Sequence, residues 1–477
     1  MTIHSFHANQ YRGAILPEGS GLSALAAAAD DYRIMLGCVL EAMLDRYERR
    51  GDYHFVDTKL SLFDGRDFAA DDPIRGPAVI YGWIQGRGLE ALAGHEAWLR
   101  RCPQIDGSLR DGLCARVRRM MSEVLDRMEA IRASNRGRLF FSMSTEGTPL
   151  RMSQDGRMVA HELPPDAPAN TTELFYVKGM AAAAQALGEE ERLAEARAWY
   201  ERIDRDIRDG RHASDQQPLD PANPAIGAVP GRHGHGARML GLGAAALFLE
   251  CTGDPVYQEM GLAYLDHVLR HHVNLQADGD TSRKYDMWEF VDDDGRPYLE
   301  PGGLLRSDPG HACECVGLAL KLLGAGEKQG TLESVSADRI NTYTEVLPAM
   351  LERNFANGFA PAGAGIVKAF DLASRRPLRS DMPWWSLPET MRAALGACRV
   401  VPADRRPRLV EIARKCSNAF LGNFVRRDLH LMAYQTIDSE AKPIKVIPAT
   451  PDADPGYHTG LSVIDYLDLL EELTGAG

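Results

Sequence analysis

The segments 171–184 (TTELFYVKGMAAAA) and 236–250 (GARMLGLGAAALFLE) decide the expected fold of this chain. Both place apolar residues at helical spacing, and both carry a run of glycine and alanine. Small side chains let helix axes approach closely, as a compact array of paired helices requires. Ordinary helix packing would explain either segment alone equally well, so the fold class depends on the rest of the chain.

Helical spacing recurs along almost the whole sequence. It is clear in the ranges 22–49, 78–99, 113–133, 189–208, 256–271, 311–323, 338–357, 389–400, 405–424 and 459–473, which brings the total to about a dozen helices. Strand-like pieces occur only in connections, at 138–143 and 149–152, followed by a turn at 155–156. No shift in composition divides the chain. We therefore predict an all-α fold with short β-hairpins in its loops, in which paired helices close into one ring.

Composition excludes several classes of protein. The 477 residues are 44% hydrophobic and 25% charged, which is typical of a folded globular protein. The net charge of −13 argues against a nucleic-acid partner, and no apolar run reaches the roughly 18–20 residues of a membrane span. The first residues lack the features of a signal peptide, and the eight cysteines contain no CxxC pair. We expect a cytoplasmic protein with reduced core thiols and no membrane contact.

The common nucleotide, metalloprotease and serine-hydrolase motifs are absent from the sequence. What remains is a set of polar and aromatic residues at predicted helix starts. His311 and Glu314 lie three residues apart, so on a helix they share a face, and Glu314 could orient the His311 ring and raise its basicity. The alternative is a capping or core histidine that a neighbouring carboxylate satisfies.

Three other helix starts carry similar residues. His458 follows Tyr457 immediately before the last predicted helix, and Arg87 follows Tyr81 and Trp83. Arginine suits substrate oxygens or a developing oxyanion, although a lone arginine more often forms a structural salt bridge. The pair Trp384 and Trp385 precedes Glu389; tryptophan faces can stack on sugar rings, although such pairs more often belong to a core.

These residues carry a resemblance to a known family. IQGR at 84–87, PGHACE at 309–314, WWSLPE at 384–389 and GYHTG at 456–460 resemble, in order and spacing, motifs of the N-acylglucosamine 2-epimerase family. That family includes cellobiose 2-epimerases and mannose-type aldose–ketose isomerases. The similarity extends from about residue 35 to the C-terminus. It implies a single (α/α)6-barrel catalytic domain, 21–477, after an N-terminal extension, 1–20.

The resemblance also implies roles for individual residues. His311 and His458 match two histidines that act on opposite faces of an open-chain sugar, and Glu314 matches the partner of the first histidine. Arg87 matches an arginine near the substrate carbonyl. Substrate-binding positions are expected at Tyr81, Trp384, Trp385, Glu389 and Tyr457.

The chemistry agrees with these roles. A proton on the carbon next to a carbonyl is weakly acidic, so its removal needs a base with a pKa near neutrality and donors for the enolate oxygen. Two histidines across the intermediate allow epimerisation, and return of the proton to the adjacent carbon gives aldose–ketose isomerisation. We expect a small-molecule carbohydrate substrate and no cofactor or metal. A homodimer is one oligomeric state that the sequence leaves open.

The chain departs from the family pattern at three positions. Leu387 replaces a polar residue in the tryptophan motif, Leu461 replaces an arginine after the terminal histidine, and Met239 stands where cellobiose epimerases carry a further histidine. His233 and His235 lie near that position but match it loosely. These changes leave the identity of the sugar open.

Three alternative functions also remain. A carbohydrate hydrolase or lyase on the same barrel would use Glu314 and Glu389 as its two carboxylates. A non-catalytic sugar-binding barrel would keep the pocket without turnover. A metal site built from His271, His272 and His311 has the least support, because no carboxylate/histidine spacing typical of a helical metal site accompanies these residues.

Overall fold

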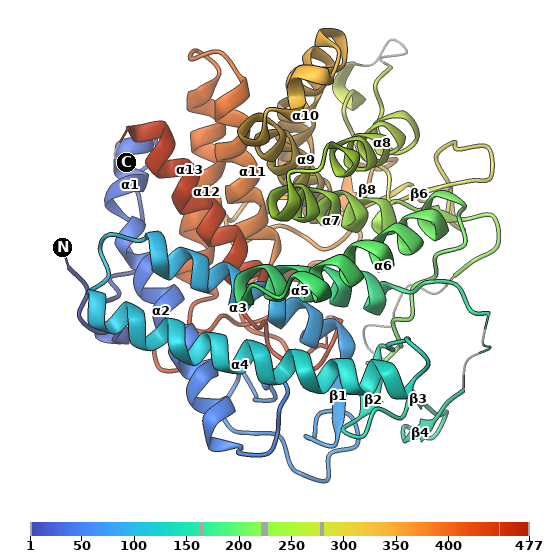
Figure 1. Cartoon of the computed structure of the whole chain (residues 1–477). Helices are drawn as coiled ribbons and strands as arrows, with labels where there is room; N and C mark the ends of the chain where they lie inside the picture. The colour runs from blue at the N-terminus through green and yellow to red at the C-terminus, as the bar shows by residue number, and fades with distance from the viewer. Residues whose placement is uncertain are drawn as a thin grey trace.

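The computed structural model describes residues 2–162, 164, 166–220, 228–276, 281–447 and 449–475. Within these residues, long helices form an inner and an outer layer (Figure 1). The inner helices are α3 (Gly82–Arg101), α5 (Thr171–Leu187), α7 (Gly236–Thr252), α9 (Pro309–Gln329), α11 (Ser386–Val400) and α13 (Ser462–Thr474). The outer helices are α2 (Ala29–Arg49), α4 (Gly107–Ser134), α6 (Glu190–Arg208), α8 (Pro255–His272), α10 (Ala337–Gly358) and α12 (Arg406–Asn423), and the short α1 (Leu22–Ala27) precedes α2.

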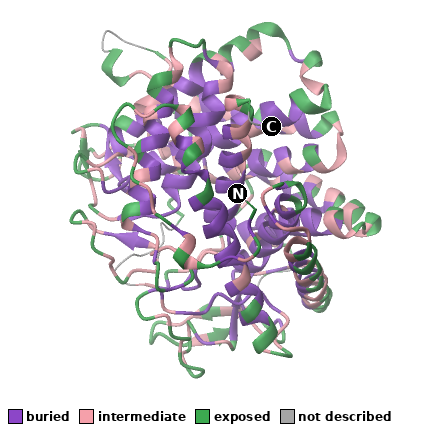
Figure 2. Cartoon of the chain, turned by 90° about the vertical axis from the view of Figure 1, so that its left-hand side faces the viewer, coloured by how far each residue is buried: buried purple, intermediate pink, exposed green. Residues whose placement is uncertain are grey.

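The inner helices form a closed ring. Each inner helix packs against the next one along the chain, and α13 returns to α3. Helix α6 shows why the outer layer stays outside: its buried residues, such as Ala196, Trp199, Tyr200 and Ile203, follow the three-to-four-residue spacing of a single face. Figure 2 shows the buried residues concentrated in the interior and the exposed ones on the periphery. The predicted all-α fold, an (α/α)6 barrel, is confirmed.

Glycine allows the closest contact of the ring, between α3 and α5. A Cβ atom on Gly179 would lie 2.2 Å from the carbonyl oxygen of Gly86, and one on Gly86 would lie 2.6 Å from the backbone of Phe175. Two backbones can approach this closely only where side chains are missing. The small residues in the 171–184 segment therefore do serve close helix packing.

Very short antiparallel strands connect the loops at the ends of the helices. The pairs are β1 (Val79–Tyr81) with β2 (Ser142–Ser144), β3 (Leu150–Met152) with β4 (Met158–Ala160), β5 (His233–Gly234) with β6 (Phe290–Val291), and β10 (Met382–Pro383) with β11 (Thr436–Ile437). A three-stranded sheet joins β7 (Arg306–Ser307), β8 (Phe370–Asp371) and β9 (Arg376–Pro377). The predicted hairpin with its turn at 155–156 corresponds to β3 and β4. The predicted strand 138–143 overlaps β2, whose strand partner β1 lies far upstream.

The N-terminal residues pack on the barrel. The Ile3 amide donates a hydrogen bond to the Gln104 carbonyl oxygen at 2.6 Å, and the hydroxyl of buried Tyr11 donates to the Leu421 carbonyl oxygen at 3.3 Å. A single 3-10 turn, η1 (Ala8–Gln10), lies between them. The domain boundary at residue 20 stays a prediction.

Two further expectations concern the whole chain. In the part of the chain that the structure describes, no helix has both the length and the apolar character needed to cross a membrane. All eight cysteines are free, and all but Cys251 are buried. The cysteines therefore contribute to the core as thiols, as the sequence predicted.

Candidate active site

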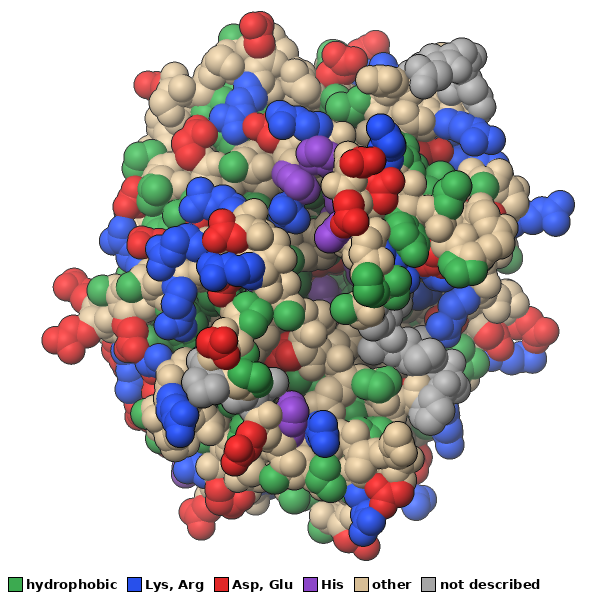
Figure 3. All heavy atoms as spheres, turned by 90° about the vertical axis from the view of Figure 1, so that its right-hand side faces the viewer, with side chains coloured by type: hydrophobic (Ala, Val, Ile, Leu, Met, Phe, Trp, Pro, Cys, Tyr) green, Lys and Arg blue, Asp and Glu red, His purple; other side chains and the backbone are tan. Residues whose placement is uncertain are grey.

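Most of the predicted site residues lie near the N-terminal ends of inner helices. Arg87 is in the second turn of α3, His311 and Glu314 are in the first two turns of α9, and Glu389 is in the first turn of α11. His458 belongs to a π-helical turn, η4 (Tyr457–Leu461), which leads directly into α13. The face of the molecule on the side of β5 and β6 is hollowed, and histidine side chains gather in and around this hollow (Figure 3).

A capping carboxylate fixes the start of α9. Asp308 accepts hydrogen bonds from the amides of Gly310 at 3.0 Å and His311 at 3.3 Å, and Pro309 occupies the first helical position, where it needs no amide donor. A Cβ atom on Gly310 would lie 2.9 Å from the Trp385 ring. Glycine at this position therefore lets the indole come close to the helix start that carries His311.

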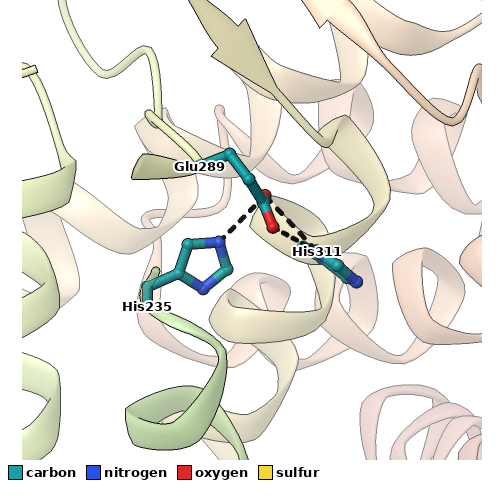
Figure 4. A group of neighbouring side chains, drawn as sticks. All are labelled: His235, Glu289 and His311. Carbon is teal, nitrogen blue, oxygen red and sulfur yellow. Dashed lines mark hydrogen bonds and ion pairs between the residues drawn. The ribbon is translucent and has the colours of Figure 1, made fainter. Parts of the chain in front are cut away.

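The side chain that faces His311 is Glu289, which the sequence analysis did not nominate. The Nδ1 atom of His311 lies 3.2 Å from Glu289 Oε1, and the Nε2 atom of His235 lies 3.1 Å from Glu289 Oε2 (Figure 4). Asp308 Oδ2 also lies 3.3 Å from His311 Nδ1. The structure therefore differs from the prediction that Glu314 orients His311: the carboxylates beside Nδ1 are Glu289 and Asp308.

Strand pairing explains why His235 and Glu289 meet. Strand β5 ends one residue before His235, and β6 begins one residue after Glu289, so the β5–β6 ladder holds the two side chains together. His235 is 1% exposed, and its Nδ1 atom has no hydrogen-bond partner in the described chain. In the sequence, Glu289 is one carboxylate in the connection between α8 and α9. No local pattern links it to His235, which lies more than 50 residues upstream.

The charges around His311 favour its protonated form. Burial opposes protonation, but the carboxylates of Asp308 and Glu289 outweigh it and raise the pKa of His311. Burial would raise the pKa of Glu289, yet His235 and His311 hold it well below its usual value. An Nδ1 atom that donates to a carboxylate leaves Nε2 as the atom available for proton transfer.

His458 is positioned by a second turn with a capping carboxylate. Gly456 adopts a left-handed conformation with φ of 84°, which glycine accommodates without strain. Asp454 then accepts hydrogen bonds from the amides of Tyr457 at 3.0 Å and Thr459 at 2.8 Å. These bonds satisfy the free amides of η4 and fix the backbone from which His458 projects.

Glu389 anchors His458 as Glu289 anchors His311. Its Oε1 atom lies 3.0 Å from His458 Nδ1 and accepts a hydrogen bond from the Ser462 hydroxyl at 2.7 Å, while Oε2 accepts one from Arg392. Burial works against ionisation of this carboxyl group, but Arg392 and His458 lower the pKa of Glu389 to about 2. Glu389 was predicted to bind substrate; in this structure its contacts are to protein.

The two histidines meet at Trp385. The ring centroid of Trp385 lies 5.3 Å from that of His311, in a stacked arrangement, and 5.7 Å from that of His458. The Trp384 ring packs edge-on to His458 at 6.2 Å. Strand β10, which ends one residue before Trp384, pairs with β11 and holds both tryptophans in place. Two histidines about 150 residues apart in sequence thus share one aromatic neighbour.

Arg87 occupies an aromatic box. Its guanidinium carbon lies 4.2 Å from the ring centroid of Phe175 and 5.4 Å from those of Trp83 and Tyr457. Its Nε atom is buried without a hydrogen-bond partner in the described part of the chain. The rings stabilise the cation and leave donors of the guanidinium free, unlike the structural salt bridge considered from the sequence.

Tyr457 and Tyr81 have different surroundings. The Tyr457 ring lies 4.9 Å from that of His458, and its hydroxyl accepts a hydrogen bond from Lys178 at 2.7 Å. Burial is the main cause that raises the pKa of Tyr457 to about 12. Tyr81 is a core residue, fully buried against Phe141, and its hydroxyl donates to the backbone. Trp83, rather than Tyr81, is the upstream aromatic residue that contacts Arg87.

A cavity lies along the inner helices. All six inner helices or the turns before them contribute to its wall, which includes Glu90, Lys178, Glu314, Glu389, Arg392, Tyr457 and Leu461. Leu461 therefore places an apolar surface where the family pattern has an arginine. Leu387 and Met239, the other two departures, are buried at 0% and 3% exposure.

Two groups of side chains could hold a cation. In the described chain, one ligand atom each from His235, Glu289 and His311 lie within 4.8 Å of one another, and the same holds for Glu314, Glu389 and His458. In each group at least one histidine nitrogen lies within hydrogen-bond distance of a carboxylate oxygen. The predicted absence of a metal stays a prediction.

The fold is similar to that of solved sugar epimerases and isomerases. Cellobiose 2-epimerase from Bacillus thermoamylovorans B4167 superposes with a TM-score of 0.63 and 12% identity, covering 92% of this chain and 98% of that one. A D-mannose isomerase superposes with a TM-score of 0.59 and 14% identity, covering 90% of this chain and 97% of that one. Cellobiose 2-epimerase from Spirochaeta thermophila DSM 6192 superposes with a TM-score of 0.58 and 15% identity, covering 91% of this chain and 98% of that one. At these identities the likeness shows the fold alone.

The sequence comparisons identify the family. No curated protein gives a significant sequence match. The family model of N-acylglucosamine 2-epimerase (GlcNAc 2-epimerase) matches residues 152–453, which is well over half of the 477 residues. The matched region includes His311, Glu314 and the tryptophan motif but ends before His458. The protein therefore belongs to the N-acylglucosamine 2-epimerase family and is a sugar epimerase or isomerase.

Proposed function

We propose that this protein is a cofactor-independent sugar 2-epimerase or aldose–ketose isomerase that works through an enediolate, with His311 and His458 as its acid–base pair. One observation carries the proposal. Each imidazole has its Nδ1 atom beside a carboxylate, the half-buried Glu289 or the buried Glu389, and both rings lie within 6 Å of Trp385, measured between ring centroids. Two oriented imidazoles at one site suit proton removal and proton return.

The two histidines have different roles in this scheme. The carboxylates around His311 favour its imidazolium form, so we assign His311 as the acid, and we assign His458, the other imidazole beside Trp385, as the base. The base removes the proton next to the open-chain carbonyl, and the electron pair moves onto the carbonyl oxygen. The acid returns a proton to the same carbon for epimerisation. For isomerisation it gives the proton to the adjacent carbon, while the hydroxyl proton on the carbon that lost its hydrogen moves to the former carbonyl oxygen.

Arg87 stabilises the negative charge that develops on oxygen. Its unpaired donors are already held in place by three aromatic rings, so little reorganisation accompanies the reaction. Trp384 and Trp385 provide flat surfaces for the sugar, and the Tyr457 ring contacts both Arg87 and His458. The substrate class is an aldose or ketose, as the names of the cellobiose 2-epimerase and D-mannose isomerase relatives suggest.

Solvent exchange tests the reaction directly. The protein is incubated in deuterated water with aldoses, N-acylhexosamines and disaccharides, and NMR spectra record deuterium at the carbon next to the carbonyl. We expect wild type to exchange at least one sugar, and His311→Ala and His458→Ala each to lose exchange by at least about 10²-fold while circular dichroism stays unchanged. Exchange retained in both variants would contradict the proposal.

A glycoside hydrolase is the second candidate, because Glu314 and Glu389 lie close together. Hydrolysis with retention needs one carboxylate free to attack the sugar. Glu389 already accepts hydrogen bonds from Ser462 and Arg392 and lies beside His458, so it is poorly placed for attack. Release of new reducing ends from oligosaccharides, without exchange, would favour the hydrolase. Sugar binding in calorimetry without any chemical change would favour a non-catalytic barrel.

A further inference from the structure

Glu314 is the one predicted catalytic residue that the scheme above leaves unused. It lies on the second turn of α9, is 6% exposed and forms part of the cavity wall. Within the described residues, no backbone or side-chain group forms a hydrogen bond or ion pair with its carboxyl group. A buried carboxyl group without such partners loses its hydration and gains nothing in return when it ionises.

The charge of Glu389 acts in the same direction. Oxygen atoms of Glu314 and Glu389 and a ring nitrogen of His458 lie within 4.8 Å of one another. Arg392, Ser462 and His458 stabilise the ionised form of Glu389, so the second carboxyl group faces a fixed negative charge.

Burial and this charge raise the pKa of Glu314, although His458, His311 and Arg392 oppose the change. Two carboxyl groups held this close seldom ionise together, and here the hydrogen bonds decide which one does.

We propose that Glu314 is held as a neutral carboxylic acid whose O–H donates a hydrogen bond to a substrate oxygen in the cavity that Glu314 lines with Glu389 and Tyr457. This inference rests on the proposed function. A carboxylate at this position would repel the developing enediolate, whereas a neutral acid stabilises it, as Arg87 does from α3. The role differs from that expected from the sequence, in which an ionised Glu314 orients His311.

Two substitutions of Glu314 distinguish a role as a neutral hydrogen-bond donor from a role as a carboxylate. Glu314→Gln keeps the size and an N–H donor but cannot ionise, whereas Glu314→Ala removes the donor. We expect Glu314→Ala to lose about 10²–10³-fold in kcat, and Glu314→Gln, which keeps a donor, to lose at least about tenfold less. Equal losses in both variants would overturn the proposal, because the reaction would then need the carboxylate. Wild-type exchange in both variants would overturn it as well.

A spectroscopic measurement needs no substrate. The wild-type-minus-Glu314→Gln infrared difference spectrum at neutral pH should contain the C=O stretching band of a protonated carboxyl group. The wild-type-minus-Glu333→Gln difference spectrum is the control. Because Glu333 is an exposed glutamate, this spectrum should lack the C=O band of a protonated carboxyl group. An antisymmetric carboxylate band from Glu314 instead would overturn the inference. If no sugar exchanges with wild type, the proposed function fails, and the infrared band still decides the protonation state.

Discussion

Removing the charge of Glu289 should shift the pH range in which the protein is active. In the variant Glu289→Gln, His311 loses the nearby carboxylate whose oxygens lie 3.2 and 3.4 Å from its Nδ1 atom. A hydrogen bond to a charged group contributes about 1.5–3 kcal/mol, which corresponds to about 1–2 pH units at roughly 1.36 kcal/mol per unit. Asp308 stays in place at 3.3 Å, so we expect a decrease near the lower limit, about one unit, in the pKa of His311.

The sign of the effect follows from the role of His311 as the acid. Its pKa is raised in the folded protein, so kcat/KM falls on the alkaline side as His311 loses its proton. In Glu289→Gln this alkaline limb should move to lower pH. The assay is the rate of deuterium exchange measured across the pH range, and kcat/KM reports the free enzyme.

A matched control uses the same loop. Asp293→Asn removes a carboxylate that lies 2.7 Å from the exposed His233, outside the site, and should leave the pH profile unchanged. An alkaline limb that stays in place in Glu289→Gln, or moves to higher pH, would refute the assignment of Glu289 as the group that tunes His311.

The same ion pair should affect stability. A raised histidine pKa stabilises the fold below the ordinary histidine pKa of about 6.5, and this contribution is lost as pH rises through the folded-state value. The difference in Tm between wild type and Glu289→Gln should therefore be larger in mildly acidic than in alkaline buffer. A difference that grows toward alkaline pH would contradict this reasoning.

Two further substitutions test the aromatic box and the contact between α3 and α5. Arg87→Met should lower kcat/KM by about 10²–10³-fold. The free energy of unfolding should stay the same or rise by about 1 kcal/mol, because a cation whose Nε atom is buried without a partner is removed. A destabilised protein in urea titration would argue for a structural role. Gly179→Ala should lower the free energy of unfolding by about 1–3 kcal/mol, since its Cβ would lie 2.2 Å from the Gly86 carbonyl oxygen. Gly112→Ala, in an open position on α4, is the control and should stabilise by about 0.5–1 kcal/mol.

The helices were the most predictable part of the protein. The predicted segments 171–184 and 236–250 correspond to α5 and α7, because their apolar spacing continues through the whole of each helix. Helix α9 begins at Pro309, before the predicted start at 311, since the capping side chain Asp308 lies upstream of the apolar pattern. Periodicity reports the buried face of a helix and is less informative about its capped end.

The motifs predicted which residues belong to the site better than they predicted which residues contact one another. The sequence placed His311, His458 and Arg87 at helix starts, and the structure brings these starts to one end of the barrel. It could not identify Glu289 as the partner of His311, because that contact depends on the pairing of two-residue strands across a long connection. Tyr81 and Arg87 are six residues apart, yet one is in the core and the other in the aromatic box, a difference that the local pattern does not encode.

The arrangement of the inner helices has an electrostatic consequence. The chain carries a net charge of −13, yet α7, α9 and α11 begin beside the same group of histidines. Each helix start is equivalent to roughly half a positive charge, from aligned peptide dipoles and free amides. The starts of α7 and α11, which no side chain caps, thus place partial positive charge that belongs to the backbone beside the histidines, whereas the Asp308 carboxylate offsets it at α9. An anion that forms there is attracted by a field that no single side-chain substitution removes, and the residual activity of single-site variants should reflect it.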